Sequence, residues 1–319
     1  MRVIHIISFV SAVFVITSRR LQNNENNNSG IKQTKPVEKQ AADQKEAKSN
    51  YLGEIPPGLS PKIFAPGIVS TKDNFEFKIA FTPDGKEIYF TRGVGMGSEI
   101  RQILFTRQTD SGWTNPKATS FCGSYMDEYP AISLDGKKLF FNSNRPLPIS
   151  WNKKSASYIF NLWVTERENE NWGEPYPINT EANKGYCINY IDKSGAIYFN
   201  SSKYKHIAKS TFEKGKYSEP IELDTQIKST ECFFAQDNSY VIFSSGSPGF
   251  GKLDLFVSFI SEDGVWSKPV NLGKRINTSQ SESAPVISPD GKYFFFNRGG
   301  DIYWVDAGFI EKYKLEELK

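Results

Sequence analysis

Short apolar strands alternate with tight polar turns along most of the chain, and one such unit recurs about every fifty residues. Each copy has a short apolar strand, a turn of Asp, Gly, Asn or Ser, and a second strand rich in Phe, Tyr and Ile. This is the pattern of a β-hairpin. The five copies are FTPDGKEIYFTR (81–92), ISLDGKKLFFNSNR (132–145), YIDKSGAIYFNSS (190–202), AQDNSYVIFSS (235–245) and ISPDGKYFFFNR (287–298).

A third strand is predicted after each hairpin, and after four of these strands comes an aromatic residue, two further residues and a proline. Proline cannot donate to a ladder of strand hydrogen bonds, so it belongs on an edge strand. Four strands per unit, the last one at an edge, predict the blade of an all-β propeller. The four edges are Trp113 to Pro116, Trp172 to Pro175, Tyr217 to Pro220 and Trp266 to Pro269.

The fifth hairpin has no such edge after it, and the start of the domain can supply one. Pro61 precedes Phe64 by three residues, as Pro269 precedes Leu272. We therefore predict five blades, with the N-terminal strand completing the last blade and closing the ring. Six blades are the alternative, if the ends of the domain hide another unit.

Several of these segments resemble a known repeat. The SPDGKYFFFNR and TPDGKEIYFTR hairpins, GSPGFGKLDLFVS and VWSKPVNLGKRINTSQSESAPVISPDGK are similar to the WD40-like propeller repeat often written PD40, found in TolB and many bacterial envelope proteins. The resemblance covers residues 51–319 and implies a propeller fold without implying one activity. The third and fourth hairpins depart from it with DKSG and DNS. It does not include the separate N-terminal domain of TolB, so the partners of TolB are not implied.

The first fifty residues differ from the repeats. An apolar run from Ile4 to Ile16 has the length of a signal-peptide core and is short for a membrane span, so residues 1–20 are predicted to be a signal peptide. Arg19 and Arg20 follow directly, which leaves an uncleaved signal anchor as the alternative. Residues 21–50 carry almost nothing to bury and are predicted to be a disordered polar tether. We expect an exported protein, periplasmic or associated with the bacterial cell envelope, that meets a membrane only through an uncleaved N-terminal segment.

Overall composition narrows the partners. A formal charge of +3 over 319 residues gives no reason to expect nucleic acid. Three cysteines without CxxC spacing and two histidines argue against a zinc site, so we expect no metal and no cofactor. Cys187 and Cys232 fall on inner strands of adjacent blades, where buried thiols or a disulfide are the alternatives.

Acidic residues recur just before the first strand of several blades, among them Glu76, Glu128, Glu231 and Glu282. The inner strands of a propeller line its channel, so these carboxylates should gather at one mouth. Two interpretations are open. Glu76, Glu128 and Glu231 could form a set for glycoside hydrolysis, which needs an acid and a second carboxylate.

The second interpretation is structural. A basic residue stands where each hairpin partner ends, which predicts three ion pairs that fasten hairpins. Glu231 has only Gly246 and Ser247 opposite it and lacks such a partner. The predicted pairs are Glu76 with Arg92, Glu128 with Arg145, and Glu282 with Arg298.

The loops between second and third strands should emerge on the same face as these acids. The longest is 143–161, and exposed aromatic and polar side chains there suit a peptide or a sugar ring. The candidate binding residues on this face are Trp151, Lys153, Lys154, Tyr158, Glu231 and Lys252.

The stretch GSPGFGKLD (246–254) comes close to a phosphate-binding loop, but Leu253 stands where Ser or Thr would hold magnesium. The residues after it, LDLFVSF, predict a strand, whereas a phosphate loop needs the N-terminus of a helix. We therefore interpret the stretch as a turn, with Lys252 as a surface charge.

No complete catalytic set accompanies the predicted propeller. The leading hypothesis is a non-enzymatic binding module of the cell envelope that presents its loop face to a protein, peptide or glycan. A glycoside hydrolase using the channel carboxylates is the first alternative, and a purely structural envelope protein is the second. The sequence predicts no particular oligomeric state.

Overall fold

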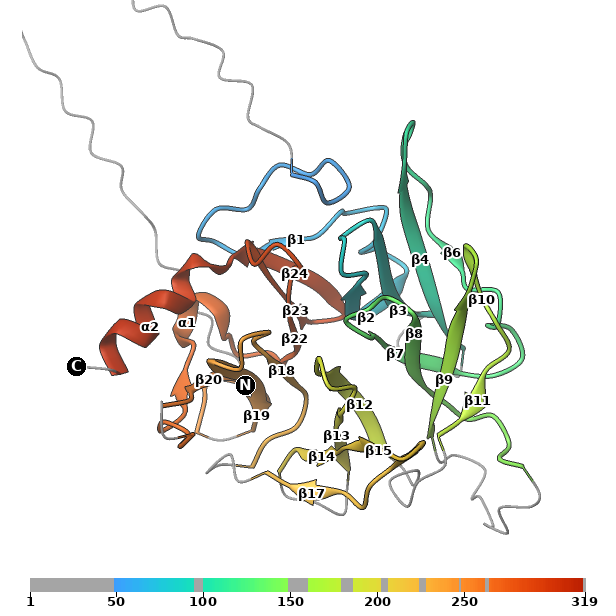
Figure 1. Cartoon of the computed structure of the whole chain (residues 1–319). Helices are drawn as coiled ribbons and strands as arrows, with labels where there is room; N and C mark the ends of the chain where they lie inside the picture. Colours follow the sequence, from blue (N-terminus) through green and yellow to red (C-terminus); the bar gives the residue numbers. More distant parts are fainter. Residues whose placement is uncertain are drawn as a thin grey trace, which may run out of the picture. The chain divides into compact units, whose positions relative to one another are not determined.

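The computed structural model describes residues 49–94, 100–148, 160–178, 186–201, 206–223, 228–246, 248–261 and 264–317, all within one compact unit, Glu46–Lys319. Five antiparallel sheets stand around a central channel, which confirms the predicted five-bladed propeller (Figure 1). Their inner strands contact one another in ring order. These are β2 (Asn74–Phe81), β7 (Asp127–Ile132), β12 (Tyr186–Ile191), β18 (Cys232–Phe234) and β22 (Glu282–Ile287).

The outer strands of each blade follow the predicted order. Blade 1 adds β3 (Glu87–Val94), β4 (Arg101–Thr109), β5 (Gly112–Trp113) and β6 (Lys117–Ala118). Blade 2 adds β8 (Lys138–Ser143), β9 (Asn161–Glu168), β10 (Asn171–Trp172) and β11 (Tyr176–Pro177). Blade 3 adds β13 (Ile197–Ser201), β14 (Ala208–Ser210), β17 (Ile221–Glu222) and the small hairpin of β15 (Phe212–Glu213) and β16 (Lys216–Tyr217). Blade 4 adds β19 (Tyr240–Ser245), β20 (Asp254–Phe259) and β21 (Val270–Asn271), and blade 5 adds β23 (Tyr293–Arg298) and β24 (Asp301–Asp306).

The ring is closed by the N-terminal strand, as predicted. Strand β1 (Lys62–Ile63) pairs antiparallel with β24 and becomes the outer strand of blade 5 (Figure 1). Phe64, which follows it, is fully buried, with its ring centroid 5.2 Å from that of Trp304 and 5.1 Å from that of Phe295. Burial of this aromatic ring fastens the start of the domain to its end.

The tight turns of the hairpins owe their shape to a repeated set of hydrogen bonds. In blade 1, the Thr82 hydroxyl donates to Asp84 Oδ1 at 2.7 Å and accepts from the Glu87 amide at 3.0 Å. Gly85 then adopts a φ of 69°, where a side chain would be strained. Asn238 takes the same position in blade 4 with a φ of 59°, which asparagine tolerates better than most residues. The Asp/Gly/Asn turn chemistry of the sequence therefore has a direct cause.

Irregularities in the inner strands leave backbone amides that need a hydrogen-bond acceptor, and the neighbouring blade supplies it. Strands β2, β7, β12 and β22 each carry a break in register. At four junctions between blades, an amide at the break donates to a side chain of the preceding blade. These bonds run from Lys78 N to Asn297 Oδ1 (2.9 Å), Tyr129 N to Thr91 Oγ1 (3.0 Å), Ile188 N to Asn142 Oδ1 (3.0 Å) and Ala284 N to Glu231 Oε2 (2.9 Å).

The sequence did not predict the helical segment at the end of the described chain. Residues Ala307–Phe309 form a 3-10 turn (η2), followed by helix α2 (Ile310–Glu317), while the short helix α1 (Gly273–Ile276) follows β21. Phe309 and Ile310 are buried in the apolar cluster shared by blades 4 and 5. Within the described ranges, no helix is both long and apolar enough to span a bilayer.

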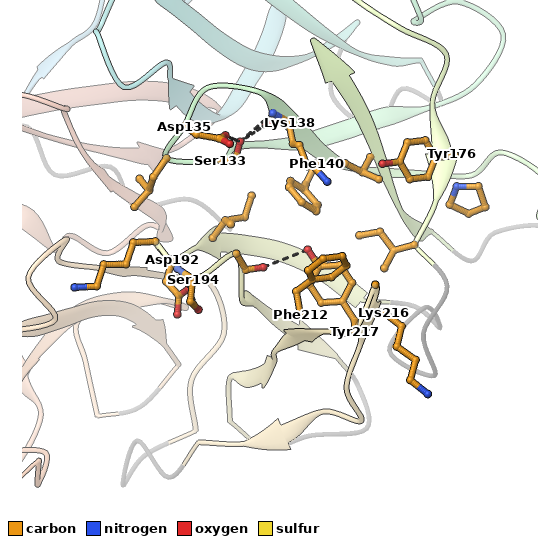
Figure 2. A pocket seen from close by; sticks show the side chains of 18 residues that line it. Ser133, Asp135, Lys138, Phe140, Tyr176, Asp192, Ser194, Phe212, Lys216 and Tyr217 are labelled. Carbon is orange, nitrogen blue, oxygen red and sulfur yellow. Dashed lines mark hydrogen bonds between the residues drawn. The ribbon is translucent and has the colours of Figure 1, made fainter.

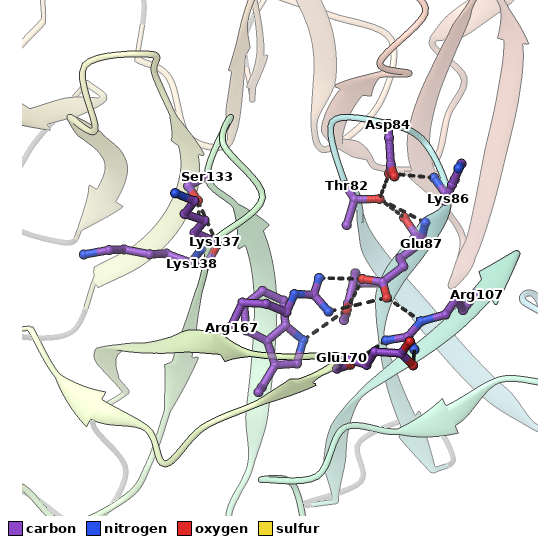
Figure 3. A network of polar contacts seen from close by, with 12 residues as sticks. Thr82, Asp84, Lys86, Glu87, Arg107, Ser133, Lys137, Lys138, Arg167 and Glu170 are labelled. Atoms are coloured by element: carbon purple, nitrogen blue, oxygen red, sulfur yellow. Dashed lines mark hydrogen bonds and ion pairs between the residues drawn. The ribbon is translucent and has the colours of Figure 1, made fainter.

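A polar network joins blades 1 and 2 near the turn between β2 and β3 (Figure 3). Glu87 lies at its centre and accepts hydrogen bonds from Arg107 of blade 1 (2.5 Å) and Arg167 of blade 2 (2.6 Å). The Tyr89 hydroxyl donates to the same carboxylate at 2.7 Å. The guanidinium of Arg167 also lies 4.0 Å from the centre of the Trp172 ring, a cation–π contact. One buried carboxylate therefore ties two blades together.

The pKa of Glu87 reports how strongly this network favours the charged carboxylate. Burial raises the pKa, but hydrogen bonds from Arg167 and Tyr89, together with the charges of Arg167 and Arg107, bring it below its ordinary value. A carboxyl whose pKa is lowered on folding adds stability that is present above its unfolded pKa, about 4.3, and that is lost as pH falls through the folded pKa.

We predict that Glu87→Gln lowers the free energy of unfolding at pH 7 by about 2 to 3 kcal/mol, because two guanidinium groups lose their shared carboxylate. The variant should also lose less stability than the native chain when the pH falls below about 4.3. Urea unfolding from pH 7 to 3 measures both effects. Glu170→Gln is the matched control, because Glu170 pairs with the same Arg107 at 2.9 Å but is largely exposed. Equal losses of stability in the two variants would contradict the role of Glu87 as the carboxylate that ties blades 1 and 2 together.

Candidate functional site

A cavity of about 680 Å³ opens at the end of the channel where strands β2, β7 and β22 begin. Five of the predicted residues line it: Glu76, Glu128, Glu231, Lys252 and Arg298. Gly299 and Gly300, from the turn between the second and third strands of blade 5, also line it. The acids and the blade loops therefore meet on one face, and we call this cavity the channel mouth.

The predicted pair of Glu76 and Arg92 is present in blade 1. The two residues lie opposite each other on β2 and β3, with Arg92 Nε 2.7 Å from Glu76 Oε1. The Thr71 hydroxyl and amide donate to the same carboxylate at 2.6 and 3.0 Å. Because this side chain is fully buried and its oxygens are occupied, it fastens the hairpin and is a poor candidate for catalysis.

Blade 5 repeats this arrangement. Glu282 lies opposite Arg298, with Arg298 Nε 2.9 Å from Glu282 Oε1. Thr278 takes the place that Thr71 has in blade 1 and donates through its hydroxyl at 2.6 Å. Two blades therefore use the same bonded set of a glutamate, an arginine and a threonine.

The predicted pair of Glu128 and Arg145 is wrong. Arg145 binds Asp127 instead, through two guanidinium nitrogens, one of them 3.0 Å from Oδ2. Asp127 is the residue two positions before the positive-φ residue Tyr129, as Glu76 is before Lys78. Successive strand residues face opposite sides, so a shift of one position sends the neighbouring carboxylate elsewhere.

Glu128 instead pairs with Arg101 of blade 1, at 2.5 Å. Burial raises the pKa of Glu128, the hydrogen bond and charge of Arg101 oppose the rise, and the charge of Glu231 adds to it. Glu128 and Glu231 are therefore two acids of one cavity that influence each other, whereas Glu76 is committed to its hairpin.

Glu231 is held by residues from two other blades. Its carboxylate accepts the Tyr129 hydroxyl of blade 2 at 2.6 Å and the Ala284 amide of blade 5 at 2.9 Å. Burial and the charge of Glu231 raise the pKa of Tyr129 well above its ordinary value, so its hydroxyl remains a donor. The sequence correctly separated Glu231 from the hairpin pairs but gave no sign of these partners.

Lys78 lies two residues further along β2 than Glu76. Its side chain is 1% exposed, and the amine donates to the Asn189 carbonyl of blade 3 at 2.8 Å. Burial lowers the pKa of Lys78, against the charge of Glu231, which raises it. Lys78 lines a second cavity of about 80 Å³, which shares no lining residue with the channel mouth.

An aromatic shelf borders the channel mouth, and sequence reasoning missed it. The rings of Phe75 and Phe77 are stacked with centroids 5.6 Å apart, and the edge of Tyr129 meets Phe77 at 5.3 Å. Gly93, opposite Phe75 in the register, permits this stack, because a Cβ there would lie 2.2 Å from the Phe75 ring. The sequence feature that could have indicated this stack is Gly93, which lies opposite Phe75 on the neighbouring strand.

The near-match to a phosphate-binding loop is a turn, as predicted. Strand β20 follows it, and the Asp254 carboxylate accepts the amides of Phe250 and Gly251 at 2.7 and 2.9 Å. Gly251 passes so close to blade 5 that an added Cβ would lie 1.8 Å from the Gln280 carbonyl. Lys252 is exposed at the edge of the channel mouth.

Four predicted binding residues, Trp151, Lys153, Lys154 and Tyr158, lie outside the described residues, so their role stays a prediction. No cluster of three or more His, Cys, Asp or Glu side chains suited to a metal ion occurs in the part of the chain that the structure describes. The three cysteines are free thiols. Burial raises the pKa of Cys187 at the channel mouth to about 12, which makes it a weak nucleophile.

No family model and no curated protein sequence matches the chain. Among solved structures, the chain is similar to a TolB-type protein of Agrobacterium tumefaciens, with 16% identity, a TM-score of 0.47 and coverage of 75% of this chain and 73% of that one. For TolB of Acinetobacter baumannii the identity is 14% and the TM-score is 0.46, with coverage of 74% of this chain and 55% of that one, so the chain spans about half of that protein. For the periplasmic gluconolactonase PpgL of Pseudomonas aeruginosa the identity is 12% and the TM-score is 0.42. The match covers 70% of this chain and 65% of that one, just under two thirds of its length. These similarities concern the fold alone.

We predict that Asp127→Asn lowers the free energy of unfolding by about 3 kcal/mol, because it leaves the Arg145 guanidinium without its carboxylate in a nearly buried position. Glu128→Gln should cost less than about 1 kcal/mol, because its partner Arg101 is 32% exposed and water can solvate the guanidinium once the carboxylate is lost. Chemical unfolding of the two single variants at pH 7 measures the difference. A larger loss of stability in Glu128→Gln than in Asp127→Asn would contradict the pairing of Arg145 with Asp127 and favour its pairing with Glu128.

Proposed function

We propose that this protein is a non-enzymatic binding module that uses the channel mouth to hold a glycan or an extended peptide, alone or as part of a protein. The observation that carries the proposal is the aromatic shelf of Phe75, Phe77 and Tyr129 beside an open cavity of about 680 Å³. Aromatic faces with nearby polar groups suit the apolar face of a sugar ring or a peptide side chain.

The charges of the mouth favour a ligand without strong charge. Glu76 and Glu282 are neutralised by Arg92 and Arg298, and Glu128 is paired with Arg101. Apart from Lys252 and the paired Arg101 and Arg298, the exposed or half-buried polar side chains that line the mouth are neutral. They include Ser279, Gln280, Ser281 and Ser283.

We place this module outside the cytoplasm, in the periplasm or at the bacterial cell envelope. The apolar run from Ile4 to Ile16 supports export, and the polar segment 21–50 supports a tether that sets the propeller away from its point of attachment. Loop 143–161 would add further contacts on the same face, since it connects β8 to β9 as the other mouth loops connect second and third strands.

We predict that Phe77→Ala weakens binding of the recognised glycan or peptide about tenfold, because it removes the middle ring of the shelf. The full chain, applied to arrays of bacterial envelope glycans and of unstructured peptides, identifies the ligand, and calorimetry then compares the variants. Phe212→Ala is the control, since Phe212 is an exposed aromatic residue that does not line the mouth. Equal binding by both variants, and by a chain with loop 143–161 replaced, would contradict a site at the channel mouth, and the absence of any bound glycan or peptide would favour a purely structural envelope protein.

Glycoside hydrolysis remains the second candidate function, on one observation. Glu128 has a raised pKa and shares a cavity with Glu231, whose charge contributes to that rise. A carboxyl with a raised pKa beside a second carboxylate is the arrangement that glycosidases require, with Glu128 in the role of acid.

For a binding module we predict no release of nitrophenol from a panel of nitrophenyl glycosides by the native chain. Turnover that falls at least a hundredfold in Glu128→Gln and in Glu231→Gln, while both variants keep their folding transition, would establish the hydrolase instead. Glu76→Gln serves as the control, because Glu76 is buried against Arg92 and should affect stability alone.

A further inference from the structure

A second large cavity, of about 470 Å³, lies between blades 2 and 3, and we call it the seam pocket (Figure 2). Strand β7 runs from Asp127 near the channel mouth to Ile132, and the turn that follows it, with Ser133 and Asp135, lines the seam pocket. The two cavities therefore lie at opposite ends of the same strand and share no lining residue. Whatever binds at the mouth leaves the seam pocket free.

The interior of the seam pocket is apolar. Its buried side chains are Phe140, Val164, Ile178 and Ile191, three of them from blade 2 and one from blade 3. Clusters of this kind normally lie beneath other side chains, but here they line a cavity large enough for a small organic molecule. An apolar lining of this size favours a ligand with an apolar body.

Three aromatic side chains extend this lining toward solvent. Tyr176 of blade 2 is 44% exposed and Phe212 of blade 3 is 46% exposed, and both line the pocket beside Tyr217 (Figure 2). The tyrosine hydroxyls are already used: Tyr176 donates to Glu166 at 2.7 Å and Tyr217 to the Gly195 carbonyl at 3.2 Å. The aromatic groups therefore offer ring faces to a ligand, which favours a flat or ring-shaped apolar body.

The acidic groups at the rim are held in place by the protein. Asp135 Oδ1 accepts the Ser133 hydroxyl at 2.6 Å and the Lys137 amide at 2.9 Å. Asp192 accepts several turn donors, and its Oδ2 lies 3.4 Å from the amine of Lys209. These two carboxylates shape the turns, and the charge of Asp192 is compensated by Lys209.

The lysines at the rim are less committed. Lys138 pairs with Glu166 at 3.3 Å, but Lys193 and Lys216 are exposed and form no ion pair within the part of the chain that the structure describes. Both belong to blade 3 and line the pocket that Tyr176 borders from blade 2. The rim therefore offers positive charge to a ligand whose apolar part fills the interior.

We propose that the seam pocket binds a small amphipathic organic anion, with an aromatic or compact apolar body and one carboxylate or sulfonate. The body lies between the rings of Tyr176 and Phe212, and the anionic group lies at the rim, where the charges of Lys193 and Lys216 attract it. This site is independent of the function proposed for the channel mouth, and gives the propeller a small-molecule ligand as well as a polymeric one.

The test uses 4-phenylbutyrate and its uncharged counterpart 4-phenylbutanol as probes of the full chain, with calorimetry as the measurement. The anion should bind at least tenfold more tightly than the alcohol, and its affinity should fall as salt rises from low to physiological concentration. Phe212→Ala should weaken both probes, because it removes a wall of the pocket. Phe77→Ala, at the channel mouth, should change neither.

The double variant Lys193→Ala with Lys216→Ala should lower the affinity for 4-phenylbutyrate about tenfold and leave that for 4-phenylbutanol unchanged. Lys62→Ala with Lys268→Ala is the matched control, since both residues are exposed and neither lines the pocket. Equal affinity for the two probes, or equal losses in the two double variants, would overturn the proposal. Loss of probe binding in Phe77→Ala would move the site to the channel mouth and overturn it as well.

Discussion

The propeller depends on one constraint: an inner strand with a break in its register exposes an amide that its own sheet does not bond. A buried amide without a partner is costly, so the fold must supply an acceptor from outside the blade. At four junctions, the acceptor is a side chain of the preceding blade, as between Lys78 and Asn297 or between Tyr129 and Thr91. Each blade is thereby completed by its neighbour, and the ring is stabilised as a whole.

The same constraint explains the unusual chemistry at the channel mouth. Blade 4 supplies a carboxylate, Glu231, where other blades supply an amide or hydroxyl oxygen. A carboxylate has room for a second donor, and the Tyr129 hydroxyl provides it from across the channel. The main role of the Glu231 carboxylate is therefore to accept hydrogen bonds that join blades. This favours a mouth that recognises ligands over one that must leave two acids unoccupied for catalysis.

The sequence predicted the fold well because a repeat is a local pattern. Turn chemistry, strand alternation and the offset from Pro61 to Phe64 each need only a few neighbouring residues, and the pairing of β1 with β24 followed from them. Contacts between blades left no comparable pattern. Glu231 and Tyr129 are separated by 102 residues in the chain. The pairing of Arg145 failed for a different reason: two adjacent acids precede the strand, and spacing alone did not tell which one faces the hairpin partner.

Closure by β1 also has a consequence for how the chain folds. The hydroxyl of Ser70, near β1, bonds to the Ile302 carbonyl across 232 residues of chain. Blade 5 therefore has an unpaired edge, and Phe64 lacks its aromatic neighbours, until nearly the whole domain has been synthesised. Contacts of such long sequence separation form late and slow the final step. The edge of blade 5 is therefore the sheet edge that stays exposed longest while the domain folds.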